Sequence, residues 1–234
     1  MKAALITGGG NRIGKAIGLF LAGKGYQIAI HYQKSDPKAL IKEIEKSGGV
    51  AVPFQADLNN ESEVEKIIPA VIKCFPQLEV LVNNASIFEP GDFKDIDILQ
   101  LNRNFNINFK APFILSRDFF NRLKSGNIIN MVDAKITHQQ HNYNTYLLSK
   151  KILMAYTEMA AVEFGPQMRI NAIAPGAILP PPGKDETYLM ERVGESVLKK
   201  TGSKEDILQA VDFLIKNTFV TGQCLYIDGG THLT

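Results

Sequence analysis

Tyr146 and Lys150 are the two residues of this chain whose types and spacing best suit proton transfer. They are four positions apart in a helical pattern over 145–164, so both side chains lie on one face of the predicted helix. An ammonium beside a phenol favours the phenolate, which predicts a pKa for Tyr146 below its usual value of about 10 and acid–base chemistry near neutral pH. We expect Asn144 or Thr145 to cap this helix. Taken alone, the spacing also fits a solvated helix face.

A run of glycines between positions 8 and 14 predicts a phosphate site. The run follows an apolar, strand-like segment and opens a helical pattern over 11–24. Glycines let a backbone approach phosphates closely, and the N-terminus of a helix offers unpaired N–H groups and a partial positive charge. Arg12, inside the turn, adds a fixed charge beside the phosphates or a substrate. The alternative for the turn alone is an ordinary strand–helix connection.

The elements that must position these residues alternate between strands and helices. Repeated β-α-β order with apolar strands predicts a parallel sheet that is covered on both faces. We expect strands at 2–7, 27–32, 50–54, 80–83, 127–132, 169–174 and 223–227, and helices near 11–24, 37–47, 60–74, 95–123, 145–164 and 204–217. The sequence has no linker, shift in composition or internal repeat, so 1–234 is predicted to be one α/β domain with a doubly wound, seven-stranded sheet.

The segment 177–198 breaks this alternation. It contains a run of prolines at 180–182 and leads into a short helical pattern. A loop of this kind beyond the strand ends is expected to cover a substrate, and a plain surface connection is the alternative.

Composition restricts the class of protein. Of the 234 residues, 45% are hydrophobic and 21% charged, which suits a sizeable core. The net charge is +2 with dispersed Lys and Arg, which speaks against a nucleic-acid or membrane surface. Cys74 and Cys224 lie far apart, so we expect a reducing, cytoplasmic compartment and neither a disulfide framework nor a metal site.

Further residues occur in a fixed order along the chain. These are Thr7, Gly8 and Gly14, Asp57, Asn83-Asn84-Ala85, Asn108, Tyr146 and Lys150, and Pro175-Gly176. In this order and spacing the chain resembles the short-chain dehydrogenase/reductase family over nearly its whole length. The resemblance implies a Rossmann-type domain, a nicotinamide cofactor, hydride transfer to or from a carbonyl-like or imine-like carbon, and a homotetramer.

The resemblance also assigns site residues by position. It implies catalytic roles for Asp133, Tyr146 and Lys150. The implied cofactor-binding residues are Gly8, Gly10, Asn11, Arg12, Ile13, His31, Tyr32, Gln33, Lys34, Ser35, Asp57, Leu58, Asn84, Ala85, Ser86, Asn108, Tyr146, Lys150, Pro175 and Gly176.

Departures from the family pattern indicate a subgroup. Asp133 stands thirteen positions before Tyr146, where the family usually has serine, and Arg12 replaces a glycine. With Phe88 and the segment 31–35, these features resemble pteridine reductases, including the bacterial dihydromonapterin reductases. A carboxyl group can pair with the ring nitrogens of a pterin, and a phenyl ring offers a face for stacking opposite the nicotinamide. The substrate-binding residues implied are Arg12, Ser86, Phe88, Asp133 and Tyr146.

The end of the second predicted strand indicates which cofactor is used. Sites specific for NAD usually place an acidic residue there to bind the ribose 2′-hydroxyl. Here the residues at 31–35 include Lys34 and Ser35 but no acid, and Arg12 adds a second positive charge. We therefore predict NADPH.

These observations favour an NADPH-dependent reductase of dihydropterins, with dihydrofolate as a further substrate. Tyr146, Lys150 and Asp133, with water, are expected to manage the proton that reaches a ring nitrogen, and the immediate donor is left open. One alternative is a ketoacyl or sugar reductase on the same fold, against which Asp133 argues. The other is an NADPH-sensing module without turnover, against which the intact Tyr146–Lys150 pair argues.

Overall fold

Seven parallel strands form the centre of the molecule. The computed structural model describes residues 1–123, 125–139, 141–181 and 183–234. Over these ranges the strands make one sheet in the order β3-β2-β1-β4-β5-β6-β7. They are β1 (Ala3–Ile6), β2 (Gln27–Tyr32), β3 (Ala51–Gln55), β4 (Leu78–Asn83), β5 (Gly126–Met131), β6 (Met168–Pro175) and β7 (Cys224–Ile227). The predicted single Rossmann-type domain with a seven-stranded parallel sheet is confirmed.

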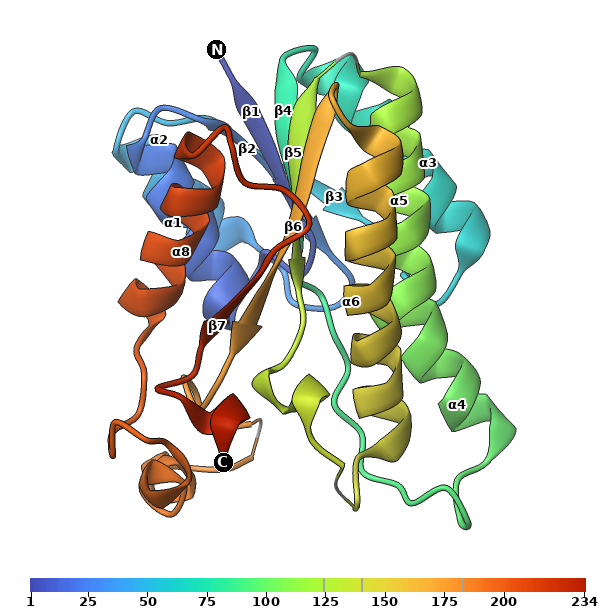
Figure 1. Cartoon of the computed structure of the whole chain (residues 1–234). Coiled ribbons are helices and arrows are strands. Elements are labelled where there is room, and N and C mark those ends of the chain that lie inside the picture. Colours follow the sequence, from blue (N-terminus) through green and yellow to red (C-terminus); the bar gives the residue numbers. More distant parts are fainter. Residues whose placement is uncertain (124, 140, 182) are drawn as a thin grey trace.

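Helices cover both faces of the sheet and give three layers (Figure 1). One face carries α1 (Arg12–Gly23), α2 (Lys38–Lys46) and α8 (Lys204–Lys216), and the other carries α3 (Glu61–Cys74), α5 (Ala111–Arg122) and α6 (Asn144–Phe164). Successive strand residues point to opposite faces, so Leu5 of β1 joins the apolar cluster under α3, α5 and α6, and Ile6 joins the cluster under α1, α2 and α8.

The chain reverses its direction of winding between β1 and β4. These two strands are neighbours in the sheet, although two strands intervene in the sequence. Loops that leave such a point part to opposite faces and open a crevice at the carboxyl ends of the strands, which is where open α/β sheets bind ligands. The segments after β1, β4 and β5 all emerge at this edge.

One long predicted helix is interrupted. The expected helix over 95–123 consists of α4 (Ile98–Phe105), a five-residue π-helical turn η1 (Asn106–Lys110) and α5. Such turns are rare and are frequently found at functional sites. This one brings Asn108 into the interior.

The side-chain cap predicted for α6 is wrong. α6 begins at Asn144, its preceding residue is Tyr143, and no side chain caps it. Instead, Asn144 N–H donates to the carbonyl of Gly91, whose own N–H donates to the Asn142 carbonyl. Backbone pairing with the segment near Gly91 fixes the start of the helix, so a side-chain cap is not required.

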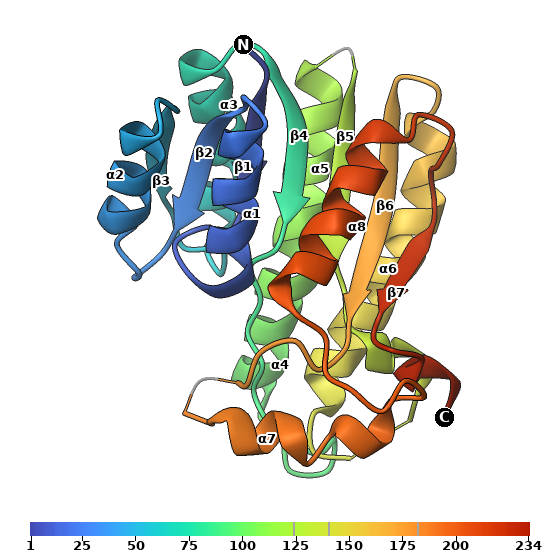
Figure 2. The ribbon, with the colours of Figure 1, turned by 90° about the vertical axis from the view of Figure 1, so that its left-hand side faces the viewer.

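The segment 177–198 holds two short helical turns, α7 (Glu186–Met190) and η3 (Val193–Glu195), and Pro182 lies outside the described residues. Figure 2 shows α7 beyond the arrowheads of the strands, at the carboxyl edge of the sheet. Among the described helices, none has the length and apolar character needed to cross a membrane.

Candidate active site

Asp133 and Tyr146 form a close pair at the carboxyl edge of the sheet. The Tyr146 hydroxyl donates to Asp133 Oδ2 at 2.6 Å, a short bond of the kind that a charged acceptor makes. The other carboxylate oxygen, Oδ1, accepts from the Lys135 amide at 2.8 Å and caps the 3₁₀ turn η2 (Ala134–Thr137). The proximity expected for Asp133 and Tyr146 is present, and the same carboxylate also holds the turn that carries it.

The electrostatics of Tyr146 are opposite to those expected from its spacing with Lys150. Burial, and then the charge and hydrogen bond of Asp133, raise the pKa of Tyr146 well above its ordinary value. Lys150 Nζ donates to the Met131 carbonyl at 2.7 Å instead of reaching the phenol oxygen. Burial lowers the pKa of Lys150 to about 8, although the charge of Asp133 opposes this change. The phenol is therefore held protonated, in the state of a proton donor.

Phe88 forms an aromatic wall beside this phenol. Its ring stacks on Tyr143 with centroids 4.0 Å apart and planes 5° apart, and meets Tyr146 edge-on at 4.7 Å. Phe88 is 39% exposed, so it belongs to the surface of the site and not to the core. Tyr143 was not among the site residues predicted from the sequence, although it lies three positions before Tyr146.

Asn108 holds the segment that leads to Phe88 against α6. Its Oδ1 accepts from the Ser86 hydroxyl at 3.0 Å and from the Ile87 amide at 2.9 Å. Its Nδ2 donates to Ser149 Oγ at 3.1 Å, one turn from Tyr146. Asn108 was expected to contact the cofactor, and the structure gives its side chain these protein partners.

The glycine turn approaches its neighbours closely. Gly8 has φ +61°, and a Cβ there would lie 3.0 Å from the Ala85 Cα. A Cβ on Gly10 would lie 2.7 Å from the Ser35 carbonyl oxygen. Beyond the turn, Arg12 and Ile13 open α1, where backbone N–H groups have no acceptor within the helix. This geometry suits an anion.

His31 lies beneath the turn and does not face a ligand. It is 2% exposed, its Nδ1 accepts from the Gly8 amide at 3.1 Å, and its Nε2 pairs with the Ala56 carbonyl at 3.1 Å. Burial lowers the pKa of His31 to about 4, so the ring is neutral. The expectation that the His31 side chain contacts a cofactor is corrected, because the ring is buried and both of its nitrogens are bonded within the protein.

The other predicted cofactor residues lie at or beyond the carboxyl ends of the strands. Lys34 and Ser35 are exposed after β2, and Asn11 Nδ2 donates to Ser35 Oγ at 3.2 Å. The Asn84 and Ala85 amides both donate to the hydroxyl of Thr7, at 2.9 and 3.0 Å. Tyr32 and Gln33 lie at the end of β2, Asp57 follows β3, and Pro175 and Gly176 lie at the end of β6.

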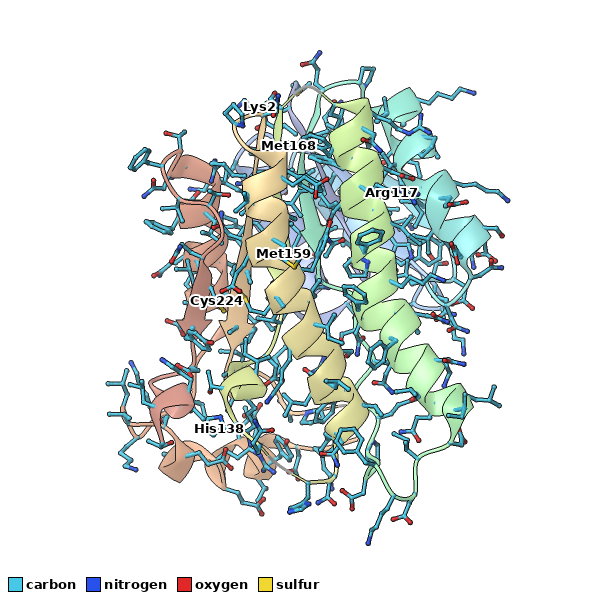
Figure 3. The ribbon with its side chains drawn as sticks, turned by 45° about the vertical axis from the view of Figure 1, so that its right-hand side comes forward. Lys2, Arg117, His138, Met159, Met168 and Cys224 are labelled. Carbon is cyan, nitrogen blue, oxygen red and sulfur yellow. The ribbon has the colours of Figure 1, made fainter. Side chains whose placement is uncertain are left out.

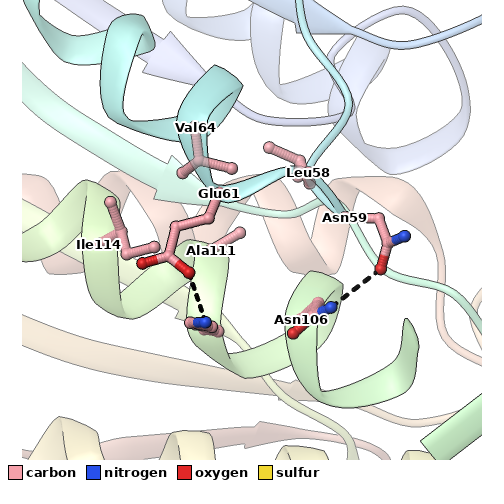
Figure 4. A pocket seen from close by; sticks show the side chains of 8 residues that line it. Leu58, Asn59, Glu61, Val64, Asn106, Ala111 and Ile114 are labelled. Carbon is pink, nitrogen blue, oxygen red and sulfur yellow. Dashed lines mark hydrogen bonds and ion pairs between the residues drawn. The ribbon is translucent and has the colours of Figure 1, made fainter. Parts of the chain in front are cut away.

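Leu58 lines a small cavity next to these residues (Figure 4). The cavity has a volume of about 50 Å³ and is bordered by Asn59 and Asn106, which share a hydrogen bond of 3.1 Å. It is large enough for water. Asn106 belongs to the π-helical turn, so the cavity joins the segment after β3 to the element that carries Asn108.

Two contacts at the site had no signal in the sequence. Arg12 Nη2 donates to the carbonyl of Pro180 at 2.7 Å, which ties the glycine turn to the segment 177–198. His138, labelled in Figure 3, pairs through Nε2 with the Thr234 main-chain oxygen at 2.7 Å, and its own carbonyl accepts from Lys151 Nζ. The chain after Asp133 is therefore tied both to α6 and to the last residues of the sequence.

Comparison with known proteins decides the family. Residues 9–232 match the family model described as Enoyl-(Acyl carrier protein) reductase. The 3-oxoacyl-[acyl-carrier-protein] reductase FabG of Staphylococcus epidermidis is 31% identical over 252 residues, which cover 99% of each chain. The chain belongs to the short-chain dehydrogenase/reductase family. Versicolorin reductase of Emericella nidulans, another relative, is 28% identical over 98% of this short-chain reductase and 95% of its own length.

Solved structures add a different group of relatives. FolM alternative dihydrofolate reductase 1 from Brucella canis, complexed with NADP, superposes with a TM-score of 0.93 at 33% identity, over 100% of this chain and 95% of its own. A blue fluorescent protein from a metagenomic library, in complex with NADPH, gives a TM-score of 0.91 at 31% identity, over 98% and 97% of the two chains. The relatives in sequence and in structure thus include reductases of different substrates.

Proposed function

We propose that this short-chain reductase is a pteridine reductase, which reduces dihydropterins of the dihydrobiopterin or dihydromonapterin type, and dihydrofolate, to their tetrahydro forms. It is an oxidoreductase of its family, and its cofactor is NADPH. The observation that carries the substrate assignment is the 2.6 Å bond between Asp133 and Tyr146. A carboxylate in this place suits the ring nitrogens and amino group of a pterin better than a ketone oxygen.

The proton chemistry follows from the chain's own residues. NADPH supplies the hydride when bound, and the reduced C=N bond needs one proton on its nitrogen. Tyr146 is protonated because burial and Asp133 oppose its ionisation. Its hydrogen bond to Asp133 provides a path from the phenol to a nitrogen at the pterin edge. Lys150 Nζ lies 5.9 Å from the centroid of the Tyr146 ring and donates to the Met131 carbonyl, so its positive charge would stabilise the phenolate that remains after proton transfer.

Residues at the carboxyl edge would hold the two ligands. The first-turn amides of α1 and the guanidinium of Arg12 suit the pyrophosphate, and Lys34 with Ser35 suits a 2′-phosphate. Phe88 would stack on the pterin ring, and Arg12 and Ser86 would bond its edge. The segment 177–198 would cover the substrate, since Arg12 already contacts it through Pro180.

The second candidate function is reduction of a ketone or a ketoacyl thioester. It is favoured by the 31% identity with a 3-oxoacyl-[acyl-carrier-protein] reductase. A serine hydroxyl at position 133 would support this function, but the chain has the carboxylate of Asp133 there. The third, an NADPH-sensing module, is disfavoured because Asp133, Tyr146 and Lys150 are assembled as acid–base residues would be, which a module without turnover does not require.

The deciding experiment follows NADPH absorbance with dihydrobiopterin, with an acetoacetyl thioester and without substrate. We expect NADPH to be oxidised only when dihydrobiopterin is present. A Tyr146→Phe variant should lower kcat for dihydrobiopterin by about 10²–10⁴, as for loss of a general acid. Turnover of the thioester in place of the pterin would establish the ketone reductase. NADPH binding without any turnover would establish the sensing module.

We also propose a homotetramer. The outer face of α6 carries Leu148, Ile152, Ala155, Met159 and Val162 at alternating spacings of four and three, and Met159 and Val162 are 73% and 85% exposed. Figure 3 shows Met159 on the outward side of α6. An apolar stripe of this kind on a surface helix suits a second copy of the chain.

Cys74 and Cys224 are free thiols, which supports a reducing compartment such as the cytoplasm.

A further inference from the structure

His31 accepts hydrogen bonds from the backbone N–H groups of Gly8 and Gly9, the first two residues of the glycine turn. Its Nδ1 accepts from the Gly8 N–H at 3.1 Å, and its main-chain carbonyl accepts from the Gly9 N–H at 2.9 Å. We infer that His31 is a positioning residue for NADPH, which sets the direction of the phosphate-binding amides without touching the cofactor. The inference rests on the NADPH cofactor and is independent of the pterin assignment.

The two partners of the imidazole leave one possible state of the ring. The Gly8 amide is only a donor, so Nδ1 must carry a lone pair. The Ala56 carbonyl is only an acceptor, so Nε2 must carry the proton. A doubly protonated ring would set an N–H against the Gly8 N–H. The site therefore selects the neutral Nε2–H tautomer.

The same imidazole joins two segments that are far apart in the sequence. Gly8 follows β1, and Ala56 directly precedes Asp57 after β3. Both segments contain proposed cofactor residues. The ring thus sets their separation, and it rests in the interior with no solvent to replace either bond.

With Gly8 and Gly9 directed inward, the turn must present later amides to a phosphate. Gly8 is further fixed at its carbonyl, to which Asn84 Nδ2 donates at 3.3 Å. The amides of Arg12 and Ile13 open α1 and lack acceptors within the helix. A change at Gly8 would rotate the peptide planes that follow it. Cofactor affinity is therefore expected to depend on the bond to Nδ1 more than on the bond to Nε2.

Two substitutions separate the two bonds. In a His31→Asn variant the side-chain oxygen lies where Nδ1 was and keeps the Gly8 bond. In a His31→Gln variant the longer amide keeps a donor for Ala56 and loses the acceptor for Gly8. NADPH affinity is measured by titrating the fluorescence of bound NADPH, and by the increase in Tm at saturating NADPH. We expect His31→Asn to retain affinity within about threefold and His31→Gln to weaken it about tenfold or more, as loss of an acceptor for a buried donor predicts.

A measurement on the unmodified protein does not depend on either variant folding. In ¹⁵N-labelled protein near neutral pH, the His31 ring should show a protonated Nε2, an unprotonated Nδ1 and a scalar coupling from Nδ1 to the Gly8 amide nitrogen. A proton on Nδ1, or equal NADPH affinities for the Asn and Gln variants, would overturn the inference. With kcat measured at saturating NADPH, a positioning role changes KM for NADPH and leaves kcat nearly unaltered.

Discussion

The Asp133 carboxylate accepts two hydrogen bonds, which have different consequences. Oδ1 stabilises the backbone of η2, while Oδ2 accepts from the phenol that is proposed to deliver the proton. A serine at this position can cap the turn as well, but it cannot hold a negative charge against Tyr146. The choice of residue thus affects the chemistry of the phenol more than the shape of the loop.

Because the two oxygens of Asp133 have different roles, an Asp133→Ser variant should lose one role and keep the other. The turn should persist, so NADPH affinity should stay within about twofold, while pterin reduction should fall by about 10² or more because the charge beside the phenol is gone. Steady-state kinetics with dihydrobiopterin and direct titration of NADPH test both parts. Asp133→Asn serves as a control of similar size. Full pterin turnover by the serine variant would remove the argument for the carboxylate.

Lys150 makes stability depend on pH in a defined window. Its pKa is lowered from 10.5 to about 8 in the folded protein, so between these values the unfolded chain binds more protons than the folded one. The free energy of unfolding therefore rises with pH from about 8. Above pH 10 the raised pKa of Tyr146 acts in the opposite sense, because the unfolded tyrosine then ionises first.

Relative to a Lys150→Met variant, the unmodified protein should gain stability between pH 8 and pH 10 with a slope approaching about 1.4 kcal/mol per pH unit. Denaturant unfolding of both proteins at several pH values gives this difference. Parallel curves for the two proteins would mean that Lys150 keeps its ordinary pKa.

At the scale of elements, α1 starts with an unusual residue. Arg12 adopts φ 52°, a left-handed conformation that costs residues other than glycine about 1–2 kcal/mol. Its guanidinium bonds to Pro180 and lies next to the proposed phosphate site. We interpret the strained backbone of Arg12 as the consequence of placing a positive side chain at this position of the turn.

Two variants isolate this backbone strain. Arg12→Gly and Arg12→Ala both lose the guanidinium, but only glycine relieves the left-handed conformation. We expect Arg12→Gly to be more stable than Arg12→Ala by about 1 kcal/mol in urea unfolding, with NADPH affinity weakened to the same extent in both. An alanine variant as stable as the glycine variant would show that the turn does not require this conformation.

The elements also show what the sequence can and cannot predict. Apolar runs and glycine spacing predicted the sheet and the helices, because both depend on local pattern. The π-helical turn at Asn108 was missed, because one extra residue within a helix leaves its apolar periodicity nearly intact. The protonated state of Tyr146 was missed as well, because burial and the distance to Asp133 arise only when β5 and α6 pack together. His31 was misplaced since the chain order gives no sign of which side of a turn a strand's last residues face.

At the scale of the whole molecule, the two faces of α6 have different roles. Its inner face carries Tyr146 and Lys150, and its outer face carries the apolar stripe that ends at Met159 and Val162. The hydrophobic effect favours covering such a stripe, at about 25 cal/mol per Å² of apolar surface. Assembly would then support α6, the helix proposed to carry the catalytic residues, on its outer face.

The proposed tetramer predicts that charged residues on the outer face of α6 prevent assembly. A double variant with Met159→Lys and Val162→Lys should reduce the assembly at least to dimers, because unpaired like charges on both copies would be buried in the interface. Sedimentation velocity measures this, and Lys73→Glu on the distant helix α3 is a matched control. A monomer for the unmodified protein at all concentrations would contradict the proposal.

The bond between Arg12 and Pro180 joins two parts of the candidate site that are proposed to bind different molecules. The bond uses only Nη2 of a guanidinium that has five N–H donors, so a phosphate bound beside Arg12 would share this side chain with the Pro180 carbonyl. A ligand that shifts Arg12 would also shift the segment 177–198, and a ligand that holds this segment would affect binding at Arg12 by the same free energy. The two proposed ligands would thus be coupled through one side chain, and each would change the affinity for the other by the same factor.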